Sequence, residues 1–189
     1  MMYKLCKTEQ SAMRQRQLEQ GLLRAMLAQQ YEDISVSDLC DQMGIPRKSF
    51  YRYFTSKDGA LFALLDHTLM EFQDTPIRAT KGRKGSALGD LERYFDFWYQ
   101  RKTLLDALAK SRLSGMLVER ATAHAQNERL MPSYLLSMAP GIQSMALTFA
   151  ICGLLSMVTQ WHYGGFQETP EEMARIATRM LVQPLIPMP

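Results

Sequence analysis

Four basic side chains lie between residues 44 and 57 with no acidic residue among them: Arg47, Lys48, Arg52 and Lys57. Cations arranged in this way can pair with phosphates, and a forked guanidinium can also bind the edge of a guanine through two hydrogen bonds. Such groups reach base edges when they stand at the start of a helix that enters the major groove. The residue types therefore point to DNA as the partner of this segment.

We predict that these cations begin on a short helix that follows a tight turn. Gly44 can adopt the positive φ angle that ends one helix, and the φ angle of Pro46 is fixed near the value that begins the next. Residues 34–43 before the turn have apolar side chains at the spacing of one buried helical face. Two short helices around one turn form a helix-turn-helix. The start of the second helix is the part that we expect to contact bases, and it carries Arg47, Lys48 and Ser49.

Two longer helices are expected to hold this motif. Residues 11–30 contain no proline, and their apolar residues recur at helical spacing. Ser56 is a natural N-cap for a further helix that begins with Lys57. Phe50 and Phe54 are expected in the core between these helices.

The rest of the chain also has helical periodicity. Residues 76–87 contain glycines and basic residues without apolar periodicity, which is typical of a linker. A long helix is expected from Pro140 to Tyr163, and Thr169 precedes a proline and two glutamates that predict the start of a last helix. No segment alternates with a period of two. We therefore predict an all-α chain of about nine helices, divided into a helix-turn-helix head (residues 1–56), a connecting helix (57–75) and a C-terminal regulatory and dimerisation domain (76–189).

The composition does not decide whether the chain binds nucleic acid, but it indicates the cellular compartment. The net charge of the 189 residues is only +3, so the whole-molecule charge neither requires nor excludes nucleic acid. The three cysteines, Cys6, Cys40 and Cys152, are odd in number and far apart, which favours a reduced, cytoplasmic protein. The apolar run at residues 145–158 is too short to span a bilayer, so no membrane partner is expected.

Catalytic chemistry has no support in the sequence. His67, His124 and His162 are isolated from one another and from the cysteines, without the spacing of metal ligands. No nucleophile elbow, phosphate-binding glycine loop or pair of carboxylates is present. We expect no catalytic residue, no metal and no cofactor, and hence not an enzyme.

The head resembles the tetracycline-repressor (TetR) family of bacterial transcriptional regulators. The resemblance lies in residues 35–39, Ser-Val-Ser-Asp-Leu, in the turn at Gly44 and Ile45, and in the closing sequence from Phe50 to Lys57. It implies a three-helix DNA-binding head and a helical second domain. It also implies that Tyr51, Tyr53 and Lys57 approach the DNA backbone. The full set of expected DNA contacts is Ser35, Ser37, Arg47, Lys48, Ser49, Tyr51, Arg52, Tyr53 and Lys57.

The resemblance further implies an effector pocket and a dimer. Candidates for the lining of the pocket are Tyr94, Phe97, Trp98, Met116, His124 and Tyr134. The last helices of family members commonly pair, and the corresponding interface here would include Met145, Phe149, Cys152, Gly153, Leu155, Ser156 and Trp161. Apolar residues at helical spacing can equally form the core of one chain.

The expected function is a homodimeric regulator, most simply a ligand-responsive repressor that binds a palindromic operator in double-stranded DNA. Its effector would be a small apolar or amphipathic molecule. The alternative keeps the DNA-binding head but makes the chain a ligand-independent DNA-organising or partner-binding protein, whose C-terminal helices are structural.

Overall fold

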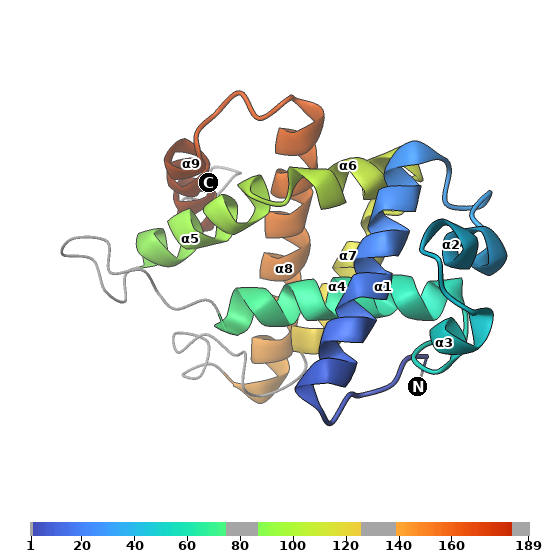
Figure 1. Cartoon of the computed structure of the whole chain (residues 1–189). Helices are drawn as coiled ribbons and strands as arrows, with labels where there is room; N and C mark the ends of the chain where they lie inside the picture. Colours follow the sequence, from blue (N-terminus) through green and yellow to red (C-terminus); the bar gives the residue numbers. More distant parts are fainter. Residues whose placement is uncertain (1, 75–86, 126–138, 183–189) are drawn as a thin grey trace. The chain divides into compact units, whose positions relative to one another are not determined.

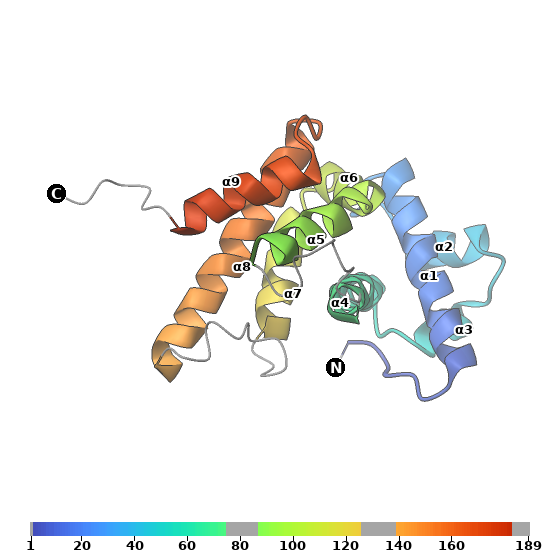
Figure 2. The same ribbon diagram turned by 90° about the vertical axis from the view of Figure 1, so that its left-hand side faces the viewer.

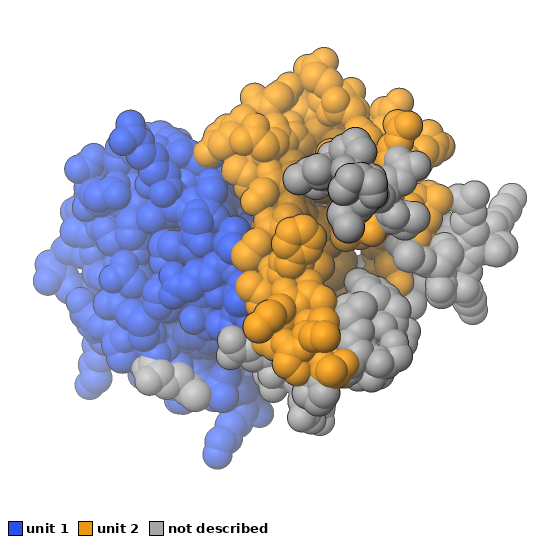
Figure 3. All heavy atoms as spheres, turned by 180° about the vertical axis from the view of Figure 1, so that it is seen from behind, with its two compact units in different colours: residues 1–70, 103–124 blue, residues 71–102, 125–189 orange. Residues whose placement is uncertain are grey.

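A computed structural model describes residues 2–74, 87–125 and 139–182 of the chain. These residues form nine helices and no strand, which confirms the predicted all-α fold. The chain divides into two compact units (Figure 3). Unit 1 comprises residues 1–70 and 103–124, and unit 2 comprises residues 71–102 and 125–189. The functional division at residues 56 and 75 stays a prediction, because compactness alone does not test it.

Unit 1 contains the predicted helix-turn-helix. Its elements are α1 (Glu9–Ala28), α2 (Val36–Gln42), α3 (Arg47–Tyr51), most of α4 (Lys57–Asp74), most of α6 (Lys102–Lys110) and most of α7 (Ser114–Ala125). Figure 1 shows the two short helices α2 and α3 next to each other. The core of unit 1 contains side chains that are almost completely buried: Leu18, Leu22, Met26, Leu39, Phe50, Phe54, Leu61 and Leu65. The predicted core positions of Phe50 and Phe54 are thereby confirmed.

The turn between α2 and α3 has the predicted glycine chemistry. Gly44 has a φ angle of 63°, which an L-residue with a side chain adopts only with strain. The amide of Gly44 donates to the carbonyl of Asp41, and the amide of Ile45 donates to the carbonyl of Cys40. These two bonds are the Schellman pattern, which satisfies the last carbonyls of α2. The glycine thus directs the chain into α3.

The first turn of α4 is capped as the sequence predicts. The hydroxyl of Ser56 accepts a hydrogen bond from the amide of Gly59 at 3.1 Å, and α4 begins at the next residue, Lys57. A serine in this position satisfies one of the amides that have no partner inside the helix.

Unit 2 contains α5 (Ala87–Tyr99), α8 (Pro140–Tyr163) and α9 (Pro170–Val182). Figures 1 and 2 show α9 lying along α5. Thr169 forms a capping box with Glu172: the amide of each residue donates to the side chain of the other, at 2.8 and 3.2 Å. The hydrogen bond from the amide of Thr169 to the carboxylate of Glu172 lowers the pKa of Glu172. The predicted bounds of α8 and the predicted start of α9 are both confirmed.

The core of unit 2 is aromatic. The ring of Phe95 meets that of Trp161 edge to face at 5.8 Å, and Trp161 also packs against Phe166 at 4.8 Å. Edge-to-face pairs add to the stabilisation that burial alone gives. The indole N–H of Trp161 donates to the carbonyl of Glu168, so this large side chain is both buried and hydrogen-bonded.

Candidate nucleic-acid interface

Helix α3 places one face in the core and the other in solvent. Phe50 is completely buried, whereas Arg47, Lys48, Tyr51 and Arg52 are exposed. The separation follows from the helical period, because positions 47, 48, 51 and 52 fall on one side of the helix and position 50 falls on the other. The exposed face therefore carries three cations and one aromatic ring on five helical residues and the residue after them.

The first of these cations is held by a side chain of α2. A guanidinium nitrogen of Arg47 donates to the hydroxyl of Ser37. This bond brings together two of the predicted DNA contacts from different helices. Because Arg47 is otherwise exposed, its remaining donors are available for the edge of a base.

Ser35 has a structural role at the start of α2. Its hydroxyl accepts from the amide of Asp38 at 3.0 Å and donates to the carboxylate of the same residue at 2.6 Å. Ser35 is therefore the N-cap of α2. A contact of this hydroxyl with DNA would have to share it with the cap.

Tyr53 lies differently from its expected place on the surface. Only 8% of its surface is exposed, and its ring packs near that of Phe54 at 6.3 Å between centroids. By contrast, 54% of Tyr51 is exposed. The bend after α3 turns Tyr53 into the head, so Tyr51 is the better placed of the two for a contact with the DNA backbone.

Lys57 is engaged within the chain. Its ammonium group donates to the carbonyls of Tyr31 and Glu32 and lies 4.2 Å from the centroid of the Tyr31 ring. The Tyr31 hydroxyl donates to Asp58 of α4. Burial and this hydrogen bond raise the pKa of Tyr31. Lys57 thus ties the loop after α1 to α4 in addition to any role on DNA.

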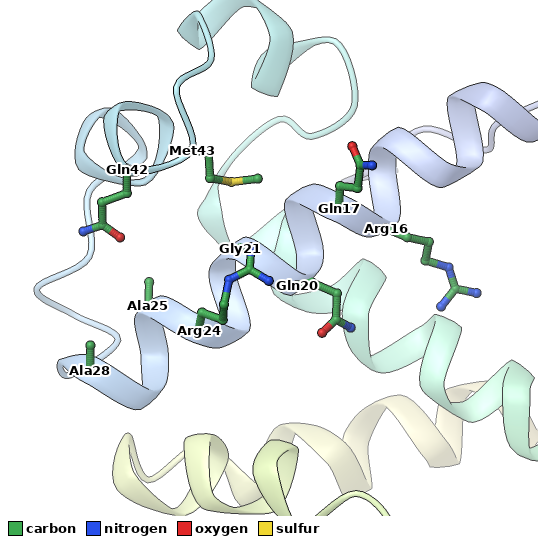
Figure 4. A pocket seen from close by; sticks show the side chains of 9 residues that line it. All are labelled: Arg16, Gln17, Gln20, Gly21, Arg24, Ala25, Ala28, Gln42 and Met43. Atoms are coloured by element: carbon green, nitrogen blue, oxygen red, sulfur yellow. The ribbon is translucent and has the colours of Figure 1, made fainter.

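A groove of about 650 Å³ runs between α1 and α2 (Figure 4). Its lining includes Arg16, Gln20 and Arg24 of α1, Gln42 of α2 and Met43 directly after α2. A Cβ atom on Gly21 would lie 2.3 Å from the sulfur of Met43, so the glycine permits the close approach of the two helices. None of the expected pocket residues lines this groove.

The expected pocket residues are distributed over both units. Tyr94, Phe97 and Trp98 belong to α5, whereas Met116 and His124 belong to α7, and Tyr134 lies outside the described residues. The Tyr94 hydroxyl and the Trp98 indole N–H are buried without a hydrogen-bond partner, and burial raises the pKa of Tyr94. His124 instead contacts the buried carboxylate of Asp66, with 3.1 Å between Nε2 and Oδ1. This contact gives His124 a structural role that its spacing in the sequence does not reveal.

Asp66 of α4 is the centre of a polar cluster that sequence patterns did not indicate. The carboxylate is 1% exposed and accepts two hydrogen bonds from the guanidinium of Arg120, at 2.7 and 2.6 Å, and one from the Tyr3 hydroxyl at 2.6 Å. Burial opposes ionisation, but these hydrogen bonds and the charges of Arg120 and His124 outweigh it, and the pKa of Asp66 is lowered. A lone aspartate in an otherwise apolar helical face was the only signal.

Comparison with known proteins decides the family of this motif. Residues 23–64, which contain α2, α3 and the Schellman turn, match the family model of bacterial regulatory proteins, tetR family. Residues 23–64 are therefore a DNA-binding domain of the TetR type, as the resemblance of residues 35–57 predicted. The chain is a transcriptional regulator with a helix-turn-helix DNA-binding domain.

Solved structures share the fold of this chain along most of its length. FadR from Bacillus halodurans, a fatty acid degradation regulator, matches with a TM-score of 0.63 and 15% identity over 96% of this chain and 98% of its own. A tetR-family transcriptional regulator from Streptomyces coelicolor matches with a TM-score of 0.53 and 20% identity over 88% of this chain and 78% of its own. The TetR family repressor AlkX from Dietzia sp. strain DQ12-45-1b, implicated in biodegradation of n-alkanes, matches with a TM-score of 0.51 and 18% identity over 87% of this chain and 95% of its own. No curated protein sequence matches the chain.

Among the residues that the structure describes, no group of three or more His, Cys, Asp or Glu side chains could hold a metal ion. All three cysteines are free. One helix, α8, is long and apolar enough from Gly141 to Tyr163 to cross a membrane by length and composition alone.

Proposed function

We propose that this regulator is a homodimeric, cytoplasmic repressor that binds a palindromic operator and leaves it when a small amphipathic molecule binds the C-terminal part of the chain. The observation that carries the proposal is the exposed face of α3, with Arg47 and Lys48 at its start and no acidic residue within the segment. A single helix of five residues makes few base contacts, so two copies are needed to read a site of useful length. Arg47 and Lys48 would read bases, and Tyr51 and Arg52 would hold phosphates.

The surface of α8 supports a dimer. Ile142, Met145, Phe149 and Tyr163 expose between 58% and 75% of their surface, and they follow one another on a single helical face together with the small residues Gly153 and Ser156. On α9, Ile176, Met180 and Leu181 are also exposed. A monomer rarely leaves so much apolar surface uncovered.

The proposed interface differs in part from the set expected from sequence. Met145, Phe149, Gly153 and Ser156 lie on the exposed face, and Cys152 at its edge is half-buried. Leu155 and Trp161 are each only 3% exposed, because they point into unit 2 from the other side of α8. They belong to the core of one chain, and the interface that we propose omits them.

A second copy of the chain is a better occupant for this face than a lipid bilayer. The same helix carries Gln143, Gln160 and His162, and Gly153 and Ser156 interrupt the apolar side chains in the middle of the face. Small residues at this spacing allow two helices to approach closely. In addition, Leu147, Leu155, Val158 and Trp161 already pack α8 into a folded unit.

Two buried donors in α5 support an amphipathic effector. The Tyr94 hydroxyl and the Trp98 indole N–H lack a partner, and the aromatic rings of Phe72 and Phe95 lie 5.6 and 5.3 Å from the ring of Tyr94. An unsatisfied buried donor costs about 1–3 kcal/mol, which a ligand oxygen would recover. FadR is named for fatty acid degradation and AlkX for n-alkane biodegradation, so an alkyl chain with an oxygen head group is the class of effector that we propose.

Selection of bound fragments from the source genome tests the function directly. The native protein should enrich a palindrome, and the double variant Arg47→Ala/Lys48→Ala should not. Lys7→Ala/Arg14→Ala is the matched control, since it removes two exposed cations of unit 1 outside α3. Release of the enriched fragment by a medium-chain fatty acid would support the effector class. Equal, salt-sensitive binding without a preferred sequence by all three proteins would instead favour a ligand-independent DNA-organising protein.

A further inference from the structure

The residues before α1 pair with the residues that follow α3. Tyr3 and Phe54 form an isolated antiparallel bridge. The amide of Lys4 donates to the carbonyl of Tyr53 at 2.8 Å, and the amide and hydroxyl of Thr55 donate to the carbonyl of Met2 at 3.1 and 3.0 Å. We call residues 2–4 the strap. It is joined to the short link between α3 and α4 by three hydrogen bonds.

Helix α3 depends on such external contacts. It has five residues, and Pro46 at its N-cap supplies no side-chain hydrogen bond. A helix of this length is not stable alone, because its few internal bonds do not offset the cost of nucleation. Its position is therefore set by the burial of Phe50 on one side and by whatever holds residues 53–55 after it.

The strap is itself held by side chains of α1 and α4. The side-chain amide of Gln15, a buried residue of α1, donates to the carbonyl of Lys4 at 3.1 Å. The hydroxyl of Tyr3 donates to Asp66 of α4 at 2.6 Å. Gly59 lies under the strap with no room for a side chain, since a Cβ there would be 2.3 Å from the carbonyl oxygen of Met2.

Asp66 connects the strap to α7. Its carboxylate binds both Nε and Nη2 of Arg120, and His124 one turn further along α7 lies 3.1 Å away. The ring of Tyr3 also packs edge to face on His67, whose Nδ1 contacts the buried carboxylate of Glu19. A chain of direct contacts thus runs from α7 through Asp66 and Tyr3 to the end of α3.

We propose that the strap is a positioning element for DNA recognition. The Tyr3 hydroxyl, which is bonded to the Asp66–Arg120 pair, fixes the strap and thereby the orientation of α3 within the head. Tyr3 is a positioning residue: it reaches the DNA through α3 and not by a contact of its own. The proposal rests on DNA binding by the exposed face of α3. It assigns a recognition role to residues outside the helix-turn-helix.

The test compares Tyr3→Phe with the native protein. The substitution removes one hydroxyl and leaves the aromatic ring. Thr68→Val is the matched control, because it also removes a buried hydroxyl, here from α4 itself. The Thr68 hydroxyl donates to the carbonyl of Leu64 in the same helix. Two quantities are measured well below the unfolding temperature: hydrogen exchange of individual amides in the DNA-free protein, and affinity for a genomic fragment that the native protein selects.

In Tyr3→Phe we expect the amides of Lys4 and Thr55 to exchange about tenfold faster, the effect of losing a hydrogen bond to a charged group. The amides in the middle of α1 should keep their rates. Affinity for the fragment should fall by about fivefold to tenfold, while Thr68→Val should change neither quantity by more than about twofold.

Three results would overturn the proposal. Unchanged exchange at Lys4 and Thr55 would mean that the hydroxyl does not hold the strap. Faster exchange throughout unit 1 would indicate general destabilisation and not positioning. Local loosening with full DNA affinity would show that the strap does not position α3. Failure of the native protein to select any fragment would contradict the proposed function, and the exchange measurement would still decide whether Tyr3 holds the strap.

Discussion

Arg47 is the residue on which sequence recognition should depend most. Its guanidinium already bonds to Ser37, so part of its freedom is lost before DNA binds. Arg47→Ala should weaken binding to the selected fragment by about 1–3 kcal/mol and relax the preference at one base position of each half-site. Titration of the fragment and of single-base variants, by fluorescence anisotropy, measures both effects.

Arg47→Lys and Ser37→Ala refine this prediction. Lysine keeps the charge but cannot form two parallel hydrogen bonds, so Arg47→Lys should lose base preference while it retains most of the salt dependence. Ser37→Ala should cost less than Arg47→Ala, since only the orientation of the guanidinium is affected. An Arg47→Ala protein with unchanged base preference would assign sequence reading to other residues.

Asp66 should make the stability of unit 1 sensitive to acid. The pKa of Asp66 is lowered in the folded protein, whereas the pKa of an aspartate in the unfolded chain is about 3.9. The ionised carboxylate therefore contributes its stability above about pH 3.9, and this contribution is lost as the pH falls through the lower, folded pKa. Asp66→Asn should lower the free energy of unfolding at neutral pH by about 3 kcal/mol, because it leaves the charge of Arg120 without its partner.

Urea denaturation at a series of pH values checks this prediction. The difference between native protein and Asp66→Asn should be largest at neutral pH and should shrink in acid, below the unfolded pKa of aspartate. A difference that is constant over the whole range would show that the ionisation of Asp66 is not the source of the stability.

Among the elements, helix α4 offers a prediction with an unusual sign. A glycine inside a helix usually costs about 1 kcal/mol relative to alanine, so Gly→Ala commonly stabilises. At Gly59, however, the added Cβ would meet the backbone oxygen of Met2 at 2.3 Å. We expect Gly59→Ala to destabilise the protein by about 1–3 kcal/mol, because the strap must shift.

Gly115→Ala in α7 is the comparison for Gly59→Ala. Nothing lies within 4 Å of the position of its Cβ, so this substitution should be neutral or stabilising by up to about 1 kcal/mol. Both free energies of unfolding can be obtained from urea titrations. If the two substitutions had the same effect, the strap would not lie over α4 in solution.

The elements could be predicted from sequence wherever their signals are local. The positive φ of Gly44, the cap at Ser56 and the capping box at Thr169 each involve residues within four positions of one another, so residue type alone indicates them. The strap could not be predicted, since its bridge joins Tyr3 to Phe54 across about fifty residues without a sequence pattern. The burial of Tyr53 escaped prediction for the same reason.

At the scale of the whole molecule, the partner of α8 also follows only in part from sequence. Helical spacing predicts an apolar helix, but not which of its faces the chain itself covers. The structure separates the two faces: Leu155 and Trp161 are buried, while Met145 and Phe149 expose 75% and 71% of their surface. Two operator half-sites about one helical turn apart require two heads at a fixed spacing, so this exposed face bears directly on function.

Phe149→Glu should separate the dimer that we propose and, with it, weaken operator binding. A carboxylate at this position would be buried against the partner without a counter-charge, at a cost of several kcal/mol, whereas each isolated chain would tolerate it in solvent. Light scattering after size-exclusion chromatography should give the mass of one chain for Phe149→Glu and of two for Ser144→Glu, a control on the same helix outside this face. Because each head would then bind alone, affinity for the full palindrome should fall to that of a half-site. A native protein that is monomeric and binds vesicles through α8 would assign the face to a membrane instead.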